Sequence, residues 1–330
     1  LVALRPAPVI VNWLGYPGTM GSPYHHYLIA DDWIVPPGSE PYYSEKVLRL
    51  PCYQPSNRFR VVADRKPSRA EAGLPEEAMV FCCFNGAHKI HRATFDRWLE
   101  ILARTPGSVL WLLGGDEGVG KRLGEYAAAK GIDRERLVFA PKAANAAHLA
   151  RYPLADLFLD TTPYGAHTTA SDALWSGVPV LTVSGRSFAS RVCGSLVRAA
   201  GLPELVCETT QEYVERAVAY GADRPGLALL KERLAAGKDS CALFDMPGLV
   251  RGLEDLYEAM WRDCEAGRLP RPDLANLDVY LEVGSAFDHE GTEVQNIADY
   301  EGWWSARLAA RDALRPIPRD RRLLADSGRE

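Results

Sequence analysis

Between residues 78 and 200 the chain alternates short apolar runs with amphipathic stretches, and this alternation strongly limits the folds it can adopt. The apolar runs predict buried strands, which lie at 78–84, 108–113, 136–140, 155–160 and 178–183. The stretches between and after them predict helices over 94–103, 119–130, 145–151, 168–177 and 187–200. Continuous apolar strands separated by helices are typical of parallel sheets that are covered on both faces and joined by right-handed crossovers. The sequence therefore predicts a doubly wound, Rossmann-like α/β domain.

The segments on either side of this domain follow a less regular pattern. Further strands are predicted at 9–14, 27–30 and 47–50, and further helices at 210–221, 225–236, 248–266 and 302–314. Residues 53–77 are rich in Arg, Pro, Ser and Glu, which is typical of a linker. The tail from residue 268 is interrupted by Pro and Arg, and its acidic middle predicts a loop.

Composition and charge exclude several classes of function. The net charge of −5 argues against a large nucleic-acid surface, which needs a basic face. The seven cysteines include no C-x-x-C pair, so metal-site spacing is absent and reduced thiols in a cytoplasmic protein are expected. No run of about 18 apolar residues and no signal peptide is visible, so no membrane association is predicted. There is also no D-x-D motif, the usual bridge between a metal and a diphosphate.

Three segments at predicted strand ends are candidates for chemistry, because ligands of doubly wound sheets bind beyond the carboxyl ends of the strands. Lys89 follows the first strand of the domain and could place a positive charge on a phosphate. The alternative is an ordinary solvated loop lysine.

The second segment, residues 160–169, leads through Gly, small residues and hydroxyls into a helix that contains Asp172. Free N–H groups at a helix start bind anions, so this segment predicts a phosphate site. Alternatively, Thr168 or Thr169 caps the helix and His167 donates to a backbone carbonyl. In the third segment, His148 and Arg151 lie three residues apart on one helix face, where a base could stack on the imidazole. The residues alone favour the plainer interpretation of that segment, an exposed helix.

Taken together, the motifs of the chain resemble the O-GlcNAc transferase/SPINDLY family. They are WLGYPGT at 13–19, YSEK at 43–46, FNGAHKI at 84–90, SVLWLL at 108–113, PLADLFLD at 153–160, HTTASDALWSG at 167–177 and ASRV at 189–192. They occur in the family's order and cover residues 1 to about 262, and the tail after 268 has no part in the match. The resemblance implies a GT-B glycosyltransferase of bacterial type, in which two Rossmann-like lobes enclose a nucleotide sugar.

The resemblance also implies how the chain is divided. Residues 1–52 would be the remnant of a truncated N-terminal catalytic lobe, and 53–77 the linker. Residues 78–240 would form the complete nucleotide-sugar-binding lobe, and 241–267 a helix that packs back on the N-terminal lobe. Residues 268–330 would be a tail of unassigned role. We therefore expect a fragment of a longer enzyme, with tetratricopeptide repeats and acceptor-facing histidines upstream.

The activity implied by the resemblance is inverting transfer of GlcNAc from UDP-GlcNAc to Ser or Thr of proteins, without a metal or other cofactor, by an enzyme expected in the cytoplasm. Lys89 corresponds to the essential lysine at the donor diphosphate. The implied nucleotide-sugar-binding residues are Ala143, His148, Arg151, His167, Thr168, Thr169 and Asp172. Among these, His148 corresponds to the base-stacking histidine, Arg151 to an arginine beside the uracil, and Asp172 to the ribose-binding acid.

Other interpretations remain open at this stage. The family's plant fucosyltransferases carry a run of threonines without the histidine at 167, so His167 favours UDP-GlcNAc over GDP-fucose. A lipid- or sugar-directed glycosyltransferase and a nucleotide-sugar epimerase share the expected fold. An inactive fragment that only binds nucleotide is a further possibility, because the upstream histidines lie outside the sequence.

Overall fold

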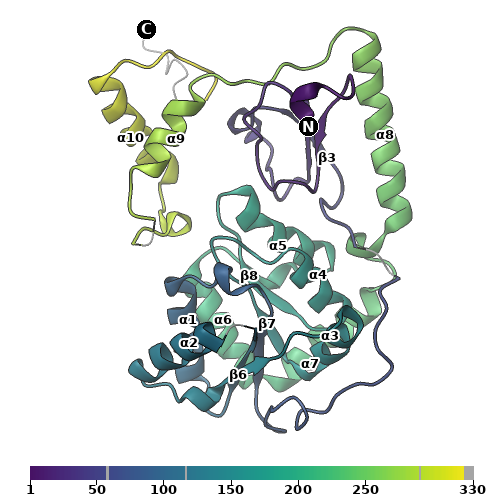
Figure 1. The fold of residues 1–330 in the computed structure, drawn as a ribbon, viewed down its shortest axis with the longest axis vertical. Coiled ribbons are helices and arrows are strands. Elements are labelled where there is room, and N and C mark those ends of the chain that lie inside the picture. The colour runs from purple at the N-terminus through teal and green to yellow at the C-terminus, as the bar shows by residue number, and fades with distance from the viewer. Residues whose placement is uncertain (57–58, 116, 290, 323–330) are drawn as a thin grey trace. The chain divides into compact units, whose positions relative to one another are not determined.

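A computed structural model describes residues 1–56, 59–115, 117–289 and 291–322 (Figure 1). Parts of the predicted linker (57–58) and of the predicted tail (290 and 323–330) lie outside the described residues. The chain divides into a central unit, residues 54–246, and a flanking unit formed by residues 1–53 together with 247–330. The domain limits drawn from the sequence remain predictions.

Within its described residues, the central unit contains a six-stranded parallel sheet. Its strands are β4 (Val80–Cys83), β5 (Val109–Leu113), β6 (Leu137–Ala140), β7 (Leu157–Leu159), β8 (Val180–Val183) and β9 (Val206–Cys207). Their order is β6-β5-β4-β7-β8-β9, and every neighbouring pair is parallel. The order reverses direction at β4 and β7, so the predicted doubly wound topology is confirmed.

Helices cover both faces of this sheet (Figure 1). They are α1 (Arg92–Arg104), α2 (Glu117–Ala129), α3 (Asn145–Arg151), α4 (Thr168–Trp175), α5 (Phe188–Ala199), α6 (Thr210–Ala222) and α7 (Arg224–Gly237). In Figure 1, α1, α2 and α6 lie on one side of the sheet, and α3 and α7 lie on the other. The strands are therefore buried from both sides, which explains their continuous apolar sequences.

Burial of the strand side chains forms the core of the central unit. All four residues of β4 and all four of β8 are buried. Each fully buried aliphatic or aromatic side chain stabilises the fold by about 1.5–3 kcal/mol. Of the seven cysteines, all free thiols, Cys82, Cys83, Cys193 and Cys207 are buried. Burial raises the pKa of the Cys207 thiol to about 12.

The flanking unit joins residues from the two ends of the chain. Its described strands β1 (Val11–Asn12), β2 (Tyr27–Ala30) and β3 (Lys46–Arg49) form a parallel sheet in that order. The long helix α8 (Met246–Glu265) contacts this sheet through Asp263. The Asp263 carboxylate accepts a hydrogen bond from the Tyr27 hydroxyl at 3.1 Å and pairs with Lys46 at 3.3 Å.

The described part of the tail contains the α-helices α9 (Leu277–Ser285) and α10 (Tyr300–Leu314). They share a small core of Val283, Leu308 and Ile317. The predicted helix at 302–314 corresponds to α10, whereas α9 was not predicted. Among the described helices, none is long and apolar enough to cross a membrane.

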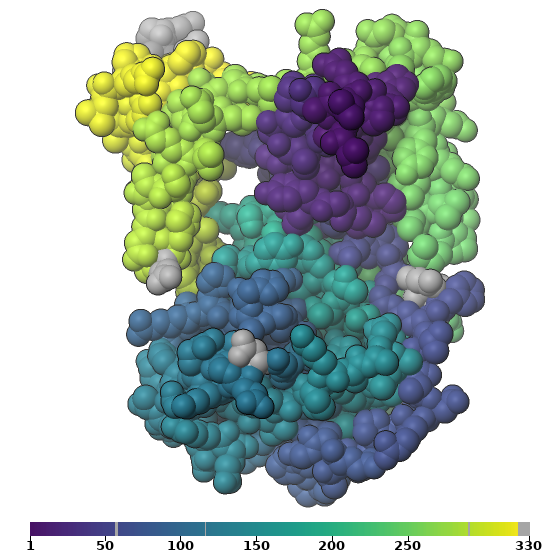
Figure 2. Space-filling model, viewed as in Figure 1, coloured from purple at the N-terminus to yellow at the C-terminus, as the bar shows by residue number. Residues whose placement is uncertain are grey.

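The linker runs along the outside of the central unit without a helix or strand in its described part, 54–56 and 59–77. Figure 2 shows it in blue-violet at the surface of that unit. Backbone hydrogen bonds attach its described part to the rest of the unit: Ser56 N–H donates to the Leu243 carbonyl at 2.7 Å, and Ala63 N–H donates to the Ala146 carbonyl at 3.0 Å.

Candidate functional site

The candidate site lies where the strand order reverses. Strands β4 and β7 are neighbours in the sheet, although about 70 residues separate them, and each runs directly into one of the predicted segments. β4 leads to Asn85 and Lys89, and β7 leads to the loop 160–167 and then to α4. In doubly wound sheets this reversal leaves a crevice in which ligands bind. The topology therefore brings two of the three predicted segments to one position.

The loop after β7 is organised around Asp160, which is buried. Its carboxylate accepts hydrogen bonds from Thr161 N–H at 2.8 Å, Ala166 N–H at 2.7 Å and the Thr182 hydroxyl at 2.7 Å. Gly165 passes so close that a Cβ there would lie 3.0 Å from Asp160 Oδ2. An ionised carboxylate accepts hydrogen bonds and donates none, so it can satisfy all of these surrounding donors. Asp160 therefore fixes the path of the chain into α4.

Lys89 reaches from the end of β4 to this loop. Its ammonium donates to the Gly165 carbonyl at 2.9 Å and lies 4.1 Å from the centre of the Tyr164 ring. The Tyr164 ring stacks in turn on the His167 imidazole, with 5.1 Å between ring centres and 25° between planes. A cation over an aromatic face is attracted by the ring's quadrupole. Lys89, Tyr164 and His167 therefore form one contiguous group.

Helix α4 begins at Thr168 without a side-chain cap. Thr168 is exposed, and the Thr169 hydroxyl donates to the Asn85 side-chain oxygen. The alternative that one of these threonines caps the helix is therefore wrong. His167 Nε2 does lie 3.2 Å from the Ala189 carbonyl, as the second alternative expected. The first N–H groups of α4 remain available, and they carry the positive end of the helix dipole.

Helix α3 lies beside the same edge. Arg151 is buried, with its guanidinium 5.2 Å from the centre of the Phe84 ring and donating to the Pro141 carbonyl at 2.7 Å. It also donates from Nε to His148 Nδ1 at 3.0 Å, while the His148 ring packs 5.1 Å from Phe84. The interpretation of this segment as an ordinary exposed helix is therefore wrong for Arg151. Ala143, in the loop before α3, is exposed.

Contacts between the three segments close the arrangement. Thr169 of α4 bonds to Asn85 after β4, the Tyr152 hydroxyl donates to the Thr169 carbonyl at 3.3 Å, and His148 of α3 packs on Phe84. Asp172 lies farther along α4 and pairs with Arg60 of the linker. The predicted residues thus lie at one edge of the sheet, within the central unit.

Burial sets the protonation of these groups. It lowers the pKa of His148 to about 4, helped by the Arg151 charge, and lowers that of His167 to about 4 as well. Burial also lowers the pKa of Lys89, while the Asp160 charge opposes this effect. It raises the pKa of Asp172, and here the Arg60 charge opposes it. At neutral pH both histidines are therefore uncharged, so the predicted diphosphate charge would be met by Lys89 and α4.

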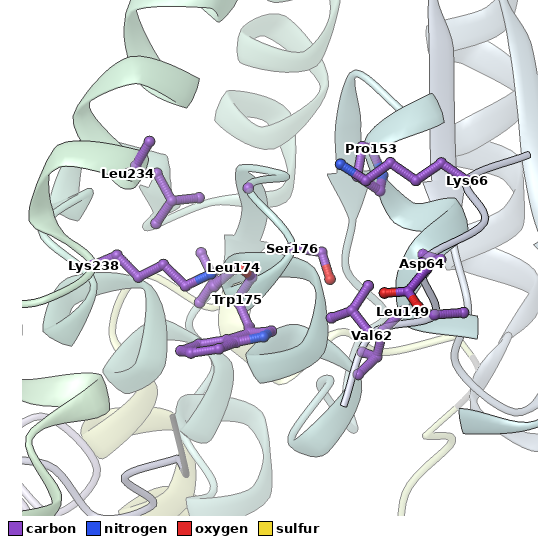
Figure 3. Close-up of a pocket in the computed structure, with 14 residues that line it drawn as sticks. Val62, Asp64, Lys66, Leu149, Pro153, Leu174, Trp175, Ser176, Leu234 and Lys238 are labelled. Atoms are coloured by element: carbon purple, nitrogen blue, oxygen red, sulfur yellow. Dashed lines mark hydrogen bonds between the residues drawn. The ribbon is translucent and has the colours of Figure 1, made fainter. Parts of the chain in front are cut away.

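A separate pocket of about 540 Å³ is lined by residues of the linker, α3, α4 and α7 (Figure 3). Val62 and Asp64 of the linker lie beside Leu149, and Lys238 extends over Trp175, 3.6 Å from its ring centre. None of the eight predicted site residues lines it. The described residues also contain no group of three or more His, Cys, Asp or Glu side chains that could hold a metal ion.

Sequence reasoning missed three residues of this arrangement. Asp160 and Tyr164 belong to the predicted segment 160–169, but neither was assigned a role, and Arg60 belongs to the predicted linker. An acid directly after an apolar strand is a usable signal for Asp160, since a buried carboxylate needs donors around it. Arg60 carried no such signal.

The comparisons with known proteins agree with this geometry. The profile of glycosyl transferase family 41 matches residues 1–56 and 61–253. A probable UDP-N-acetylglucosamine–peptide N-acetylglucosaminyltransferase of Arabidopsis thaliana is 37% identical over 278 residues, which are 82% of this chain and 28% of that protein. A UDP-N-acetylglucosamine–peptide N-acetylglucosaminyltransferase of Caenorhabditis elegans is 42% identical over 209 residues, 63% of this chain and 18% of that protein. The chain thus spans less than a third of the length of these relatives.

A solved structure shows the same fold. A mutant O-GlcNAc transferase of Thermobaculum terrenum superposes with a TM-score of 0.71 at 36% identity, covering 81% of this chain and 51% of that one. The expected GT-B glycosyltransferase fold of the α/β class is therefore confirmed. The topology, the motifs and the profile match lead to one conclusion: this chain belongs to glycosyl transferase family 41.

Proposed function

We propose that the protein to which this chain belongs transfers GlcNAc from UDP-GlcNAc to Ser or Thr hydroxyls of proteins. The observation that carries the proposal is the pairing of Lys89 with the uncapped start of α4 at the reversal of the sheet. Both features offer positive charge to a diphosphate. The names of the relatives supply the donor and the peptide acceptor.

The proposed reaction is an inverting displacement at the anomeric carbon. The acceptor oxygen forms a bond to that carbon while the bond from the carbon to the β-phosphate oxygen breaks, and the electron pair leaves with UDP as the hydroxyl proton is released. Lys89 and the N–H groups of α4 stabilise the charge that develops on the leaving UDP, and such contacts contribute about 3 kcal/mol each. In this proposal no metal takes part.

Neighbouring groups have assigned roles in the proposed site. The neutral His148 ring stacks on the uracil, with Arg151 and Ala143 beside it. His167 and Thr169 approach the phosphates and sugar together with Thr168, and Asp172 accepts hydrogen bonds from the ribose. Because Nε2 of His167 faces the Ala189 carbonyl, it donates there and leaves Nδ1 as an acceptor toward the donor sugar.

Isothermal titration of the chain with UDP and then GDP tests the donor, and transfer from UDP-GlcNAc to a Ser/Thr peptide by the longer protein tests the reaction. UDP binding that exceeds GDP binding at least tenfold supports the proposal. A preference for GDP would favour the fucosyl alternative. Failure of a folded sample to bind UDP would exclude the site as assigned. Appearance of an epimerised sugar nucleotide without acceptor would point instead to an epimerase.

A further inference from the structure

Arg60 of the linker is the feature that the proposed function leaves unexplained. Its guanidinium pairs with the Asp172 carboxylate, donates to the Ser171 hydroxyl at 2.6 Å and contacts the Ser56 hydroxyl. The side chains of Arg60 and Asp172 are only 13% and 14% exposed. A charge so well shielded from water is costly unless it is paired and hydrogen-bonded. The pair is therefore a specific contact rather than a loose surface ion pair.

The linker is held on both sides of Arg60. The hydrogen bond from Ser56 N–H to Leu243 fixes it before the arginine, and the bond from Ala63 N–H to Ala146 fixes it after. Ala146 belongs to α3, the helix that carries His148 and Arg151. Through Ala63 and Arg60 the linker thus ties α3 to α4, the two helices that provide most of the proposed nucleotide contacts.

The contact constrains one oxygen of the carboxylate. Arg60 Nη1 faces Asp172 Oδ1, and the ion pair limits rotation of the carboxylate. A guanidinium also favours the ionised form, which accepts hydrogen bonds and does not donate them. Tyr152, a second titratable group near Asp172, already donates its hydroxyl to the Thr169 carbonyl at 3.3 Å. Asp172 is thereby prepared to accept hydrogen bonds from a diol.

We infer that Arg60 is a positioning residue that holds the Asp172 carboxylate ready for the ribose hydroxyls of the donor nucleotide. The inference rests on the proposed function, because it takes Asp172 as the ribose acceptor. It adds a residue that no motif of the sequence contains and gives the linker a part in donor binding.

The test compares UDP with 2′,3′-dideoxy-UDP, which lacks both ribose hydroxyls, by calorimetry on the chain. The unsubstituted chain should prefer UDP about tenfold or more, the value of one or two good hydrogen bonds to a carboxylate. Arg60→Gln should weaken the binding of UDP about tenfold and leave the binding of dideoxy-UDP unchanged, so that the preference for UDP disappears. Arg60→Lys keeps the positive charge but lacks the planar guanidinium with its several N–H donors, so its preference for UDP over dideoxy-UDP should be intermediate. Arg65→Gln, an exposed arginine of the same linker, should change neither affinity.

A double-mutant cycle with Asp172→Asn separates positioning from a general effect on the fold. If Arg60 acts through Asp172, Arg60→Gln has no further effect on UDP affinity in the Asp172→Asn background. The inference would be overturned if Arg60→Gln weakened the binding of both nucleotides equally. Tighter UDP binding by Arg60→Gln would also overturn it, because Arg60 would then compete with the ribose for Asp172. If Arg60→Gln does not fold, the preference of Arg60→Lys for UDP over dideoxy-UDP tests the inference: a preference as large as that of the unsubstituted chain would contradict it. Failure of the folded, unsubstituted chain to bind UDP would instead remove the proposed function and this inference with it.

Discussion

The Lys89 ammonium lies 4.1 Å from the centre of the Tyr164 ring while it donates to the Gly165 carbonyl next to that ring. The lysine is thus held by the same loop that leads into α4. The Lys89 side chain is half-buried, and both of these interactions are made with residues of that loop.

Replacement of Lys89 by Ala should therefore separate function from stability. We expect the longer enzyme to lose at least about 100-fold in transfer rate, since one strong electrostatic contact to the leaving group is removed. The melting temperature should stay within a few degrees of the original. Lys121→Ala, an exposed lysine on α2, is the control and should change neither quantity. Retained transfer with normal melting would remove Lys89 from the site.

Tyr164 should matter for its ring and not for its hydroxyl. Tyr164→Ala removes the ring from both Lys89 and His167, and we expect UDP affinity to fall about fivefold, in line with about 1 kcal/mol for such a contact. Tyr164→Phe keeps the ring and should bind UDP as before. Titration calorimetry of the two variants measures the difference. If Phe lowers affinity as much as Ala does, the hydroxyl contributes and the ring argument is incorrect.

Asp160→Asn should destabilise the central unit. The substitution replaces one accepting oxygen by an amide that donates toward groups that already donate, so buried donors lose their partner. We expect a loss of about 3 kcal/mol in the free energy of unfolding, measured with urea. Thr182→Val removes a single donor and should cost less. Equal stability of Asp160→Asn and the unsubstituted chain would mean that the carboxyl is already protonated in the fold.

The half-buried His148 and His167 predict how stability depends on pH. Their pKa values are about 4 in the folded chain and near 6.5 when unfolded, so the unfolded chain binds more protons between these values. Their contribution to stability is complete above pH 6.5 and is lost as the pH falls toward 4. Urea unfolding at several pH values should show this decline, and it should be smaller in His148→Gln/His167→Gln. NMR signals of both rings that titrate near pH 6.5 would contradict the assignment.

Much of the fold could be predicted because local pattern and tertiary environment agree. The strand at 27–30 and the helix at 145–151 have the predicted limits, and the central strands were found as continuous apolar runs. β9 has only two residues, too few for a periodic signal. α9 is short, and the core that stabilises it is completed by Leu308 and Ile317 from farther along the chain, so its own sequence gives little sign of a helix.

The residues of the candidate site could be predicted where they lie near strand ends or within recognisable motifs. Lys89 follows a strand, His167 directly precedes α4 and Asp172 lies one turn into that helix. At such positions backbone geometry directs side chains to one edge of the sheet. Arg60 meets Asp172 across 112 residues of sequence, from a segment without periodicity. Such a contact depends on how the linker crosses the finished surface, which no local pattern encodes.

The flanking unit is assembled from two distant stretches of chain, and this has a consequence for synthesis on the ribosome. Strand β2 is buried throughout, yet Asp263, the partner of Tyr27, is made only after residues 54–246 have been translated. At cellular rates that interval is roughly 10–40 s. During this interval β2 and β3 lack the contacts that Asp263 makes with Tyr27 and Lys46. Holding chaperones should therefore bind residues 1–53 more strongly in nascent chains arrested before residue 247 than in chains that extend beyond residue 265.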